Sequence, residues 1–302
     1  MKTTHIFSHL LLFSANLIYA LNYTVAKDVM PSYIEPAGFI LMRVIGAVFL
    51  FAACHFIFIK ESVQRKDIFL LAVCGLFGVA INQLFFFEGL NLTTPINASI
   101  VMTSNPIWVL LLSFLILKES LNMKKVIGFF SGIIGASILI LDGNSLEISS
   151  NYQIGNVLVL INAFSYALYL VLVKRLMKKY HPITIMFYVF FFGFFYVLPF
   201  GYKELNQVEW NIIPINIFYA IGFVVIFTTF FAYLFNSAGL KNLSPSTVSI
   251  YIYLQPLFAT LFAIYREVDN IDSKKVIASF FIFIGVYLVS TYSSKQKTKK
   301  LS

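Results

Sequence analysis

Ten apolar windows, each about as long as a bilayer-spanning helix, constrain this chain more than any other feature. A hydrocarbon core of about 30 Å takes roughly 20 residues of helix. The mean hydropathy of +0.85, with 59% hydrophobic and 12% charged residues, exceeds what a soluble core requires. The sequence therefore predicts an all-α integral membrane protein with ten transmembrane helices. The predicted spans are approximately 5–26, 36–59, 67–88, 96–117, 124–141, 155–174, 182–200, 213–237, 246–265 and 275–292.

Much of the sequence from Leu84 to Gly135 recurs 150 residues later. The chain therefore consists of two copies of one five-helix unit, 1–141 and 155–292. A periplasmic linker at 142–154 and a basic cytoplasmic tail at 293–302 complete the predicted organisation. The recurring residues include Gly89 and Gly239, Pro95 and Pro245, Pro106 and Pro256, Lys124 and Lys274, and Gly135 and Gly285.

The distribution of basic residues predicts the orientation of the helices. With ten spans, 16 of the 22 Lys and Arg residues fall on the side of the N-terminus, 5 fall on the other side and Arg43 lies within a span. The positive-inside rule then places both termini in the cytoplasm. Because five helices are an odd number, the second copy crosses the membrane in the opposite sense. Inverted repeats usually enclose a substrate site near the midplane and alternate between two mirror-related conformations.

Several classes of function lack their usual signals. The net charge of +9 is explained by membrane orientation, so no nucleic-acid partner is predicted. Cys54 and Cys74 lie in apolar runs and suit neither a disulfide framework nor a metal site. The sequence has no phosphate-binding loop, so ATP-driven transport is unsupported. We predict no cofactor and no metal; the predicted partners are the lipid bilayer and a small solute, and the oligomeric state is left open, with a monomer as one option.

The doubled layout resembles the EamA branch of the drug/metabolite transporter superfamily. The resemblance rests on the five-helix repeat, on Pro36 with Arg43, on the steps Asn105-Pro106 and Gln255-Pro256, and on Lys118-Glu119 followed by Gly128. It implies a bacterial inner-membrane, multi-pass carrier or exporter of small metabolites, often amino acids, with a central cavity.

The second copy departs from this family pattern at two places. The loop after the ninth span reads Arg266-Glu267-Val268-Asp269-Asn270 and lacks the usual Gly-Glu. Val189 stands about where an arginine equivalent to Arg43 is sought. These departures leave the cavity interpretation intact and question a symmetric site with two arginines.

Polar residues gather on one side of the first predicted helix, within an arc of roughly 140° at 100° per residue. We interpret Asn16 and Tyr19 as cavity lining; the alternative is hydrogen bonding between helices, which contributes only about 1 kcal/mol per contact. Several other spans contribute polar or amphipathic candidates for solute binding, which are Asn82, Asn162, Tyr166 and Tyr233.

The fourth and ninth spans carry internal prolines, Pro106 and Pro256, which remove a backbone hydrogen bond and bend a helix. The freed carbonyls need protein or a wet cavity around them. A structural kink with local capping is the alternative to a functional one. The candidates for solute contact beside the predicted kinks are Thr103, Asn105, Trp108, Tyr253 and Gln255.

Arg43 is the only charged side chain well inside a predicted span, and an intramembrane charge is a functional hypothesis by default. It could hold a substrate carboxylate through its fork of donors. Alternatively, it could extend to the outer surface or pair with Glu35 or Glu88. These alternatives remain open at the level of sequence.

Together these features predict a transporter, and not an enzyme, that exports small metabolites such as amino acids. We expect alternating access around a midplane cavity, by uniport or exchange, because no Asp or Glu lies deep in a span to relay protons or sodium. The alternatives are a polytopic membrane sensor or channel and a membrane enzyme acting on lipid-linked substrates. The enzyme would need clustered His, Asp or Glu at one membrane face, and the sequence shows no such cluster.

Overall fold

The computed structural model describes residues 2–93, 95–120, 122–141, 150–265 and 273–299. Every regular element in these ranges is a helix, as the apolar windows predict. In the first copy the elements are α1 (Lys2–Val29), α2 (Pro36–Cys54), η1 (His55–Ile59), α3 (Arg65–Gly75), η2 (Leu76–Ala80), α4 (Ile81–Leu92), α5 (Pro95–Met102), α6 (Asn105–Leu117) and α7 (Met123–Leu141).

The second copy has a similar order of α-helices, with the 3₁₀ segment η5 as an additional element. It contains α8 (Ser150–Leu176), α9 (Pro182–Asn206), η3 (Trp210–Ile212), α10 (Ile215–Phe223), η4 (Val224–Phe231), α11 (Ala232–Asn242), α12 (Pro245–Ser249), η5 (Ile250–Tyr253), α13 (Leu254–Tyr265) and α14 (Ser273–Lys299).

Two predicted boundaries differ from the observed helices. Residues 150–154, assigned to the linker, form the first turn of α8, and the rest of the linker lies outside the described residues. The predicted basic tail is helical as far as Lys299, because α14 continues through it. Lys and Gln are good helix formers, so charge does not end the helix where the apolar run stops.

Six continuous helical stretches within the described ranges are long and apolar enough to cross a membrane. Asn105–Leu117 and Val276–Val289 are shorter apolar helices. The ten-span count, the inversion and the cytoplasmic termini remain predictions. The six stretches are His5–Val29, Pro36–Ile59, Arg65–Leu92, Gln153–Leu176, Pro182–Asn206 and Ile215–Asn242.

The third helix of each copy is interrupted at the same place. α3 and α4 are joined by the π-helical segment η2, and α10 and α11 are joined by the π-helical segment η4. An offset of 150 residues brings Leu76–Ala80 onto the middle of Val224–Phe231. A π segment changes which side chains face inward, and such segments are frequent at functional sites.

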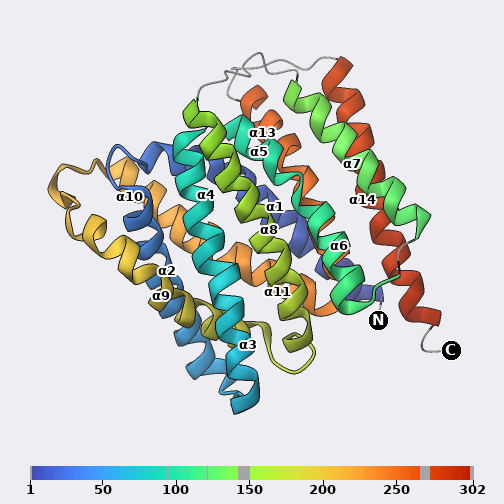
Figure 1. Ribbon diagram of the computed structural model, residues 1–302, viewed down its shortest axis with the longest axis horizontal. Coiled ribbons are helices and arrows are strands. Elements are labelled where there is room, and N and C mark those ends of the chain that lie inside the picture. The colour runs from blue at the N-terminus through green and yellow to red at the C-terminus, as the bar shows by residue number, and fades with distance from the viewer. Residues whose placement is uncertain (1, 94, 121, 142–149, 266–272, 300–302) are drawn as a thin grey trace.

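The two copies pack by equivalent contacts. α1 packs on α11 and α8 packs on α4, so the first helix of each copy meets the third helix of the other. α2 packs on α9, and α7 packs on α14 as a separate pair that lies side by side in Figure 1. α1 begins and α14 ends on the same side of the molecule (Figure 1).

Glycine allows the close approach of α7 and α14. A Cβ atom at Gly128 would lie 3.0 Å from the carbonyl oxygen of Gly285, and one at Gly285 would lie 2.7 Å from the carbonyl oxygen of Gly128. Small residues let helix backbones approach in membranes. This pair stands beside the main bundle and leaves the other helices to surround the cavity.

Candidate functional site

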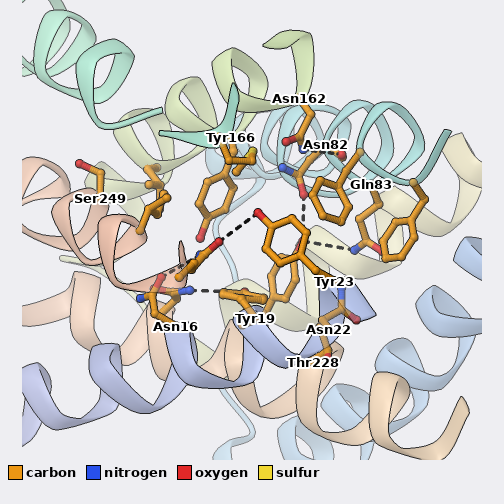
Figure 2. Close-up of a pocket in the computed structure, with 18 of the residues that line it drawn as sticks. Asn16, Tyr19, Asn22, Tyr23, Asn82, Gln83, Asn162, Tyr166, Thr228 and Ser249 are labelled. Carbon is orange, nitrogen blue, oxygen red and sulfur yellow. Dashed lines mark hydrogen bonds between the residues drawn. The ribbon is translucent and has the colours of Figure 1, made fainter. Parts of the chain in front are cut away.

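A cavity of about 80 Å³ lies between helices of both copies. Since a cavity needs roughly 10–15 Å³ of such space to hold one water, this volume admits more than one water or a small solute. Figure 2 shows side chains converging on it from different helices. Its polar and charged lining residues are Asn16, Tyr19, Asn22, Tyr23, Arg43, Asn82, Gln83, Asn162, Tyr166, Thr228, Tyr233, Asn236, Ser249 and Gln255.

One group of hydrogen bonds joins α1 to α13. Gln255 Nε2 donates to Asn16 Oδ1 at 2.9 Å, and Tyr23 Oη donates to Gln255 Oε1 at 3.1 Å. Asn16 in turn donates to the carbonyl oxygen of Leu12 at 2.8 Å. Gln255 therefore connects the two copies across the cavity, and its amide is oriented by partners on both sides.

A second group joins α4, α8 and α11. Asn162 Nδ2 donates to the carbonyl oxygen of Asn82 at 2.6 Å, and Tyr233 Oη donates to Asn82 Oδ1 at 3.0 Å. Gln83 Nε2 donates to Tyr233 Oη at 3.3 Å. Because a carbonyl oxygen can only accept, the bond to Asn82 fixes the orientation of the Asn162 amide.

Arg43 is only 2% exposed and lines the cavity. Its Nε donates to Thr229 Oγ1 at 3.0 Å, and its guanidinium carbon lies 4.3 Å from the ring centre of Phe87. Its Nη1 atom is buried without a hydrogen-bond partner. The arginine therefore does not extend to the surface. Within the described ranges the ion pairs are Lys125–Glu119 and Lys179–Asp67, so Arg43 is not neutralised by Glu35 or Glu88.

The cavity also presents acceptor atoms without partners. Asn22 Oδ1, Gln83 Oε1 and Asn162 Oδ1 are buried and unbonded in the described structure, and all three residues line the cavity. A buried polar group left unsatisfied costs about 1–3 kcal/mol. The site thus combines an unpaired cationic donor with unpaired amide carbonyl oxygens, which complements a solute with both an anionic group and hydrogen-bond donors.

Among the lining residues that the structure describes, Arg43 is the one with a permanent charge, and none is acidic. The remaining wall is apolar and includes Phe86, Phe87, Met102, Leu170 and Ile252. Within the described residues, no three His, Cys, Asp or Glu side chains lie close enough together to hold a metal ion. The lining therefore combines one cationic side chain and several amide and hydroxyl groups with an apolar wall.

Eight of the sequence-predicted site residues come together at this cavity, and their role in binding remains a prediction. The aromatic rings of Tyr19 and Tyr233 meet edge to face at 6.2 Å, and Asn236 donates to Tyr19 Oη at 3.3 Å. The eight are Asn16, Tyr19, Arg43, Asn82, Asn162, Tyr166, Tyr233 and Gln255.

The structure places the other four predicted residues outside the cavity lining. Thr103 borders a separate groove between α5, α7 and α8. Asn105 donates to the carbonyl oxygen of Ala163 at 2.6 Å, and Trp108 packs edge to face on Phe164. The ring of Tyr253 lies against Gly132 of α7.

Local breaks in the helices explain these placements. α5 ends at Met102 and α6 begins at Asn105, just before Pro106. The ninth predicted span tightens to the 3₁₀ segment η5 before α13, which contains Pro256. Side-chain directions after such breaks cannot be extrapolated along an unbroken helix.

Six further polar residues line the cavity. The polar arc of the first helix already contains Asn22 and Tyr23, and a stricter use of helical spacing would have included them. Thr228 gave a weaker signal, because its segment η4 is otherwise apolar and is π-helical. The remaining additions are Gln83, Asn236 and Ser249.

Comparison with protein families decides the broad class of the chain. The model of the EamA-like transporter family matches residues 6–141 and 153–291, one match for each copy. This chain belongs to the EamA-like transporter family. The family assignment and the apolar helices make it a multi-pass membrane protein of a transporter type.

Individual relatives agree with this assignment. The chain is 27% identical over 290 residues to the uncharacterized transporter YyaM of Bacillus subtilis, covering 95% of this chain and 94% of that protein. An uncharacterized transporter of Archaeoglobus fulgidus is 29% identical over 94% of this chain and 97% of its own length. A WAT1-related protein of Arabidopsis thaliana is 26% identical over 90% and 79% of the two chains.

A solved crystal structure has the same fold. It matches with a TM-score of 0.75 at 17% identity, over 95% of this chain and 98% of that chain. At this level of identity the likeness concerns the fold alone.

Proposed function

We propose that this transporter carries small amino acids, with the carboxylate held by Arg43 and the ammonium group by amide oxygens of the cavity wall. The observation that carries the proposal is the Nη1 atom of Arg43, a residue that lines the cavity: this atom is buried and has no hydrogen-bond partner in the described structure. An uncompensated buried charge costs several kcal/mol. A solute carboxylate removes this cost and matches the fork of guanidinium donors.

The remaining groups fit the rest of such a solute. An ammonium group donates three hydrogen bonds, and Asn22, Gln83 and Asn162 offer unpaired carbonyl oxygens. The limited volume and the aromatic wall favour a small apolar side chain. L-Alanine has about the size that the cavity admits and serves as the reference solute below.

Alternating access between two inverted five-helix repeats is part of this proposal. Equivalent residues of the two copies make equivalent contacts: Gln255 binds Asn16, and Asn105 binds the carbonyl oxygen of Ala163. The pairs are related by offsets of about 150 residues. A near-symmetric bundle can exchange two mirror-related conformations around one site.

A second pair of equivalent contacts supports the same symmetry. Lys27 Nζ donates to the carbonyl oxygen of Asn91 at 3.3 Å, and Lys174 Nζ donates to that of Lys241 at 3.3 Å. Each lysine caps the C-terminus of the third helix of its copy, where cations are favourable. Under the proposed inversion, the two caps lie at opposite membrane faces.

We further propose that net transport is export across a bacterial inner membrane, with both termini cytoplasmic, by uniport or solute exchange. The lining has no carboxylate to exchange protons or bind sodium, which are the usual means of ion coupling in transporters. The excess of Lys and Arg on the N-terminal side of the predicted spans supports the orientation.

A thermal-shift titration tests the solute assignment. Purified protein in detergent is heated with L-alanine, with L-alaninamide, which lacks the carboxylate, and with propionate, which lacks the ammonium group. Ligand binding to the folded state raises the melting temperature in a concentration-dependent way. We expect the largest rise with L-alanine. Equal responses to L-alanine and L-alaninamide would contradict the assignment to Arg43.

A further inference from the structure

The orientation of the Arg43 side chain depends on one hydroxyl group from the other copy. Thr229 Oγ1 accepts a hydrogen bond from Arg43 Nε at 3.0 Å and donates one to the carbonyl oxygen of Val224 at 2.8 Å. Thr229 is fully buried and, unlike its neighbour Thr228, does not line the cavity. It contacts the cationic residue and not the space that a solute would fill.

We infer that Thr229 is a positioning residue that sets the solute affinity of this transporter by fixing the guanidinium of Arg43. The inference rests on the proposed function of Arg43. Because the hydroxyl hydrogen is committed to Val224, the oxygen lone pair is directed at Nε. The ring of Phe87 lies 4.3 Å from the guanidinium carbon. Together these contacts hold the planar group on one edge and one face, while Nη1 stays unpaired.

The internal repeat shows that this hydroxyl is not needed to build the fold. An offset of 150 residues places Val79 at the position of Thr229, in the equivalent π-helical segment η2. Val79 is fully buried, so the π segment forms there with an isosteric side chain that lacks the hydroxyl. When Pro36 is aligned with Pro182, the first residues of α2 and α9, Val189 stands at the position of Arg43, and it is also buried. The arginine–threonine pair takes one residue from each copy, and its counterpart is a pair of buried valines, Val189 and Val79.

This comparison separates a local role from a structural one. If Thr229 served only to stabilise the π segment, the same need would exist at Val79. Valine replaces the threonine at the same pair of positions where valine replaces the arginine. This indicates that the Thr229 hydroxyl is present because Arg43 needs a hydrogen-bond acceptor. A preorganised donor binds more tightly because less freedom is lost when the solute arrives.

The test uses full-length protein in proteoliposomes with radiolabelled L-alanine as the probe. Thr229→Val removes the hydroxyl and keeps the shape, and Thr229→Ser keeps the hydroxyl. We expect Thr229→Val to raise the KM for L-alanine roughly tenfold, as for loss of one hydrogen bond to a charged group, with the maximal rate nearly unchanged. An unchanged maximal rate indicates that ground-state and transition-state binding weaken equally. Thr229→Ser should restore a KM close to that of the wild type.

Thr184→Val is the matched control. Thr184 is also fully buried, and its hydroxyl bonds to His55 Nδ1 at 3.3 Å, away from the cavity lining. This variant loses a buried hydroxyl contact and should keep the wild-type KM. Melting temperatures of all variants show whether each one folds.

The outcomes distinguish this inference from the function on which it rests. If the wild type transports L-alanine, Arg43→Met does not, and Thr229→Val keeps the wild-type KM, the positioning role alone is wrong. A fall in maximal rate without a change in KM, or a Thr229→Ser variant as weak as Thr229→Val, also overturns it. If the wild type neither binds nor transports L-alanine, the proposed function fails and this inference fails with it.

Discussion

Replacing Arg43 with methionine separates solute binding from protein stability. Methionine is uncharged and follows the arginine side chain to about the position of Nε, so Arg43→Met removes the guanidinium and its contact with Phe87 and keeps the apolar part of the side chain. The wild-type arginine is 2% exposed and has no ion-pair partner in the described structure. Burial of such a charge costs several kcal/mol. Its bond to Thr229 returns about 1.5–3 kcal/mol, and the ring contact returns about 2 kcal/mol.

These opposing contributions nearly cancel, so we expect the free energy of unfolding of Arg43→Met without solute to stay within about 2 kcal/mol of the wild type. The effect on binding should be much larger. At about 4 Å and an effective dielectric constant of about 20, a carboxylate and a guanidinium attract by about 4 kcal/mol. After desolvation of the carboxylate, a net loss of about 2–3 kcal/mol corresponds to a roughly 30- to 150-fold weaker affinity.

The assay is a thermal-unfolding titration of wild type and Arg43→Met with L-alanine, in the same detergent. We expect similar melting temperatures without solute and a concentration-dependent rise in the wild type only. A large loss of stability in Arg43→Met, together with an undiminished response to L-alanine, would show that Arg43 is a structural charge. That result would refute the reasoning about the cavity.

Two further predictions concern other parts of the chain. Gly285→Val should lower the free energy of unfolding by about 1–3 kcal/mol, as overpacking does, because the new Cβ meets the carbonyl oxygen of Gly128 at 2.7 Å. The control in the same melting experiment is Gly222→Ala, whose new Cβ has nothing within 4 Å. Equal stability of the two variants would contradict the packing argument. Burial and the cation of Lys241 lower the pKa of His181 from its usual 6.5, and its neutral ring caps α9 by accepting from the amide of Ile183. Since the pKa is lower in the folded state, the stability from His181 is present above about pH 6.5 and is lost as the pH falls through the folded-state pKa. The variant His181→Asn, which caps without titrating, should flatten the dependence of melting temperature on pH between about 7 and 5. An unchanged pH profile in this variant would be evidence against the capping role of His181.

The sequence predicted the helices well where hydropathy alone determines them. Long apolar runs such as Pro36–Ile59 and Pro182–Asn206 are continuous helices, because a helix bonds its own backbone groups within the segment. Side chains on regular stretches, such as Asn16 and Tyr19 of α1, could be placed by helical spacing and lie at the cavity.

Spacing gave poorer guidance where the backbone leaves the α-helical repeat. Asn105 follows the break between α5 and α6 and bonds to α8, and Tyr253 lies in the 3₁₀ segment η5 and packs on Gly132. Thr228 and Thr229 belong to the π segment η4, whose changed pitch turns one toward the cavity and the other toward Arg43. Pro106 and Pro256 indicate bends in these helices and not the directions of the neighbouring side chains, and no proline or glycine lies within the π segment η4.

Counterflow of radiolabelled L-alanine in proteoliposomes tests the central claim most directly. Vesicles loaded with unlabelled L-alanine are diluted into a trace of labelled solute, with equal ion concentrations on both sides. We predict transient accumulation of label above its equilibrium level in wild-type vesicles and none in Arg43→Met vesicles. Label that never exceeds equilibrium, or equal accumulation by both proteins, would contradict a carrier that alternates around Arg43.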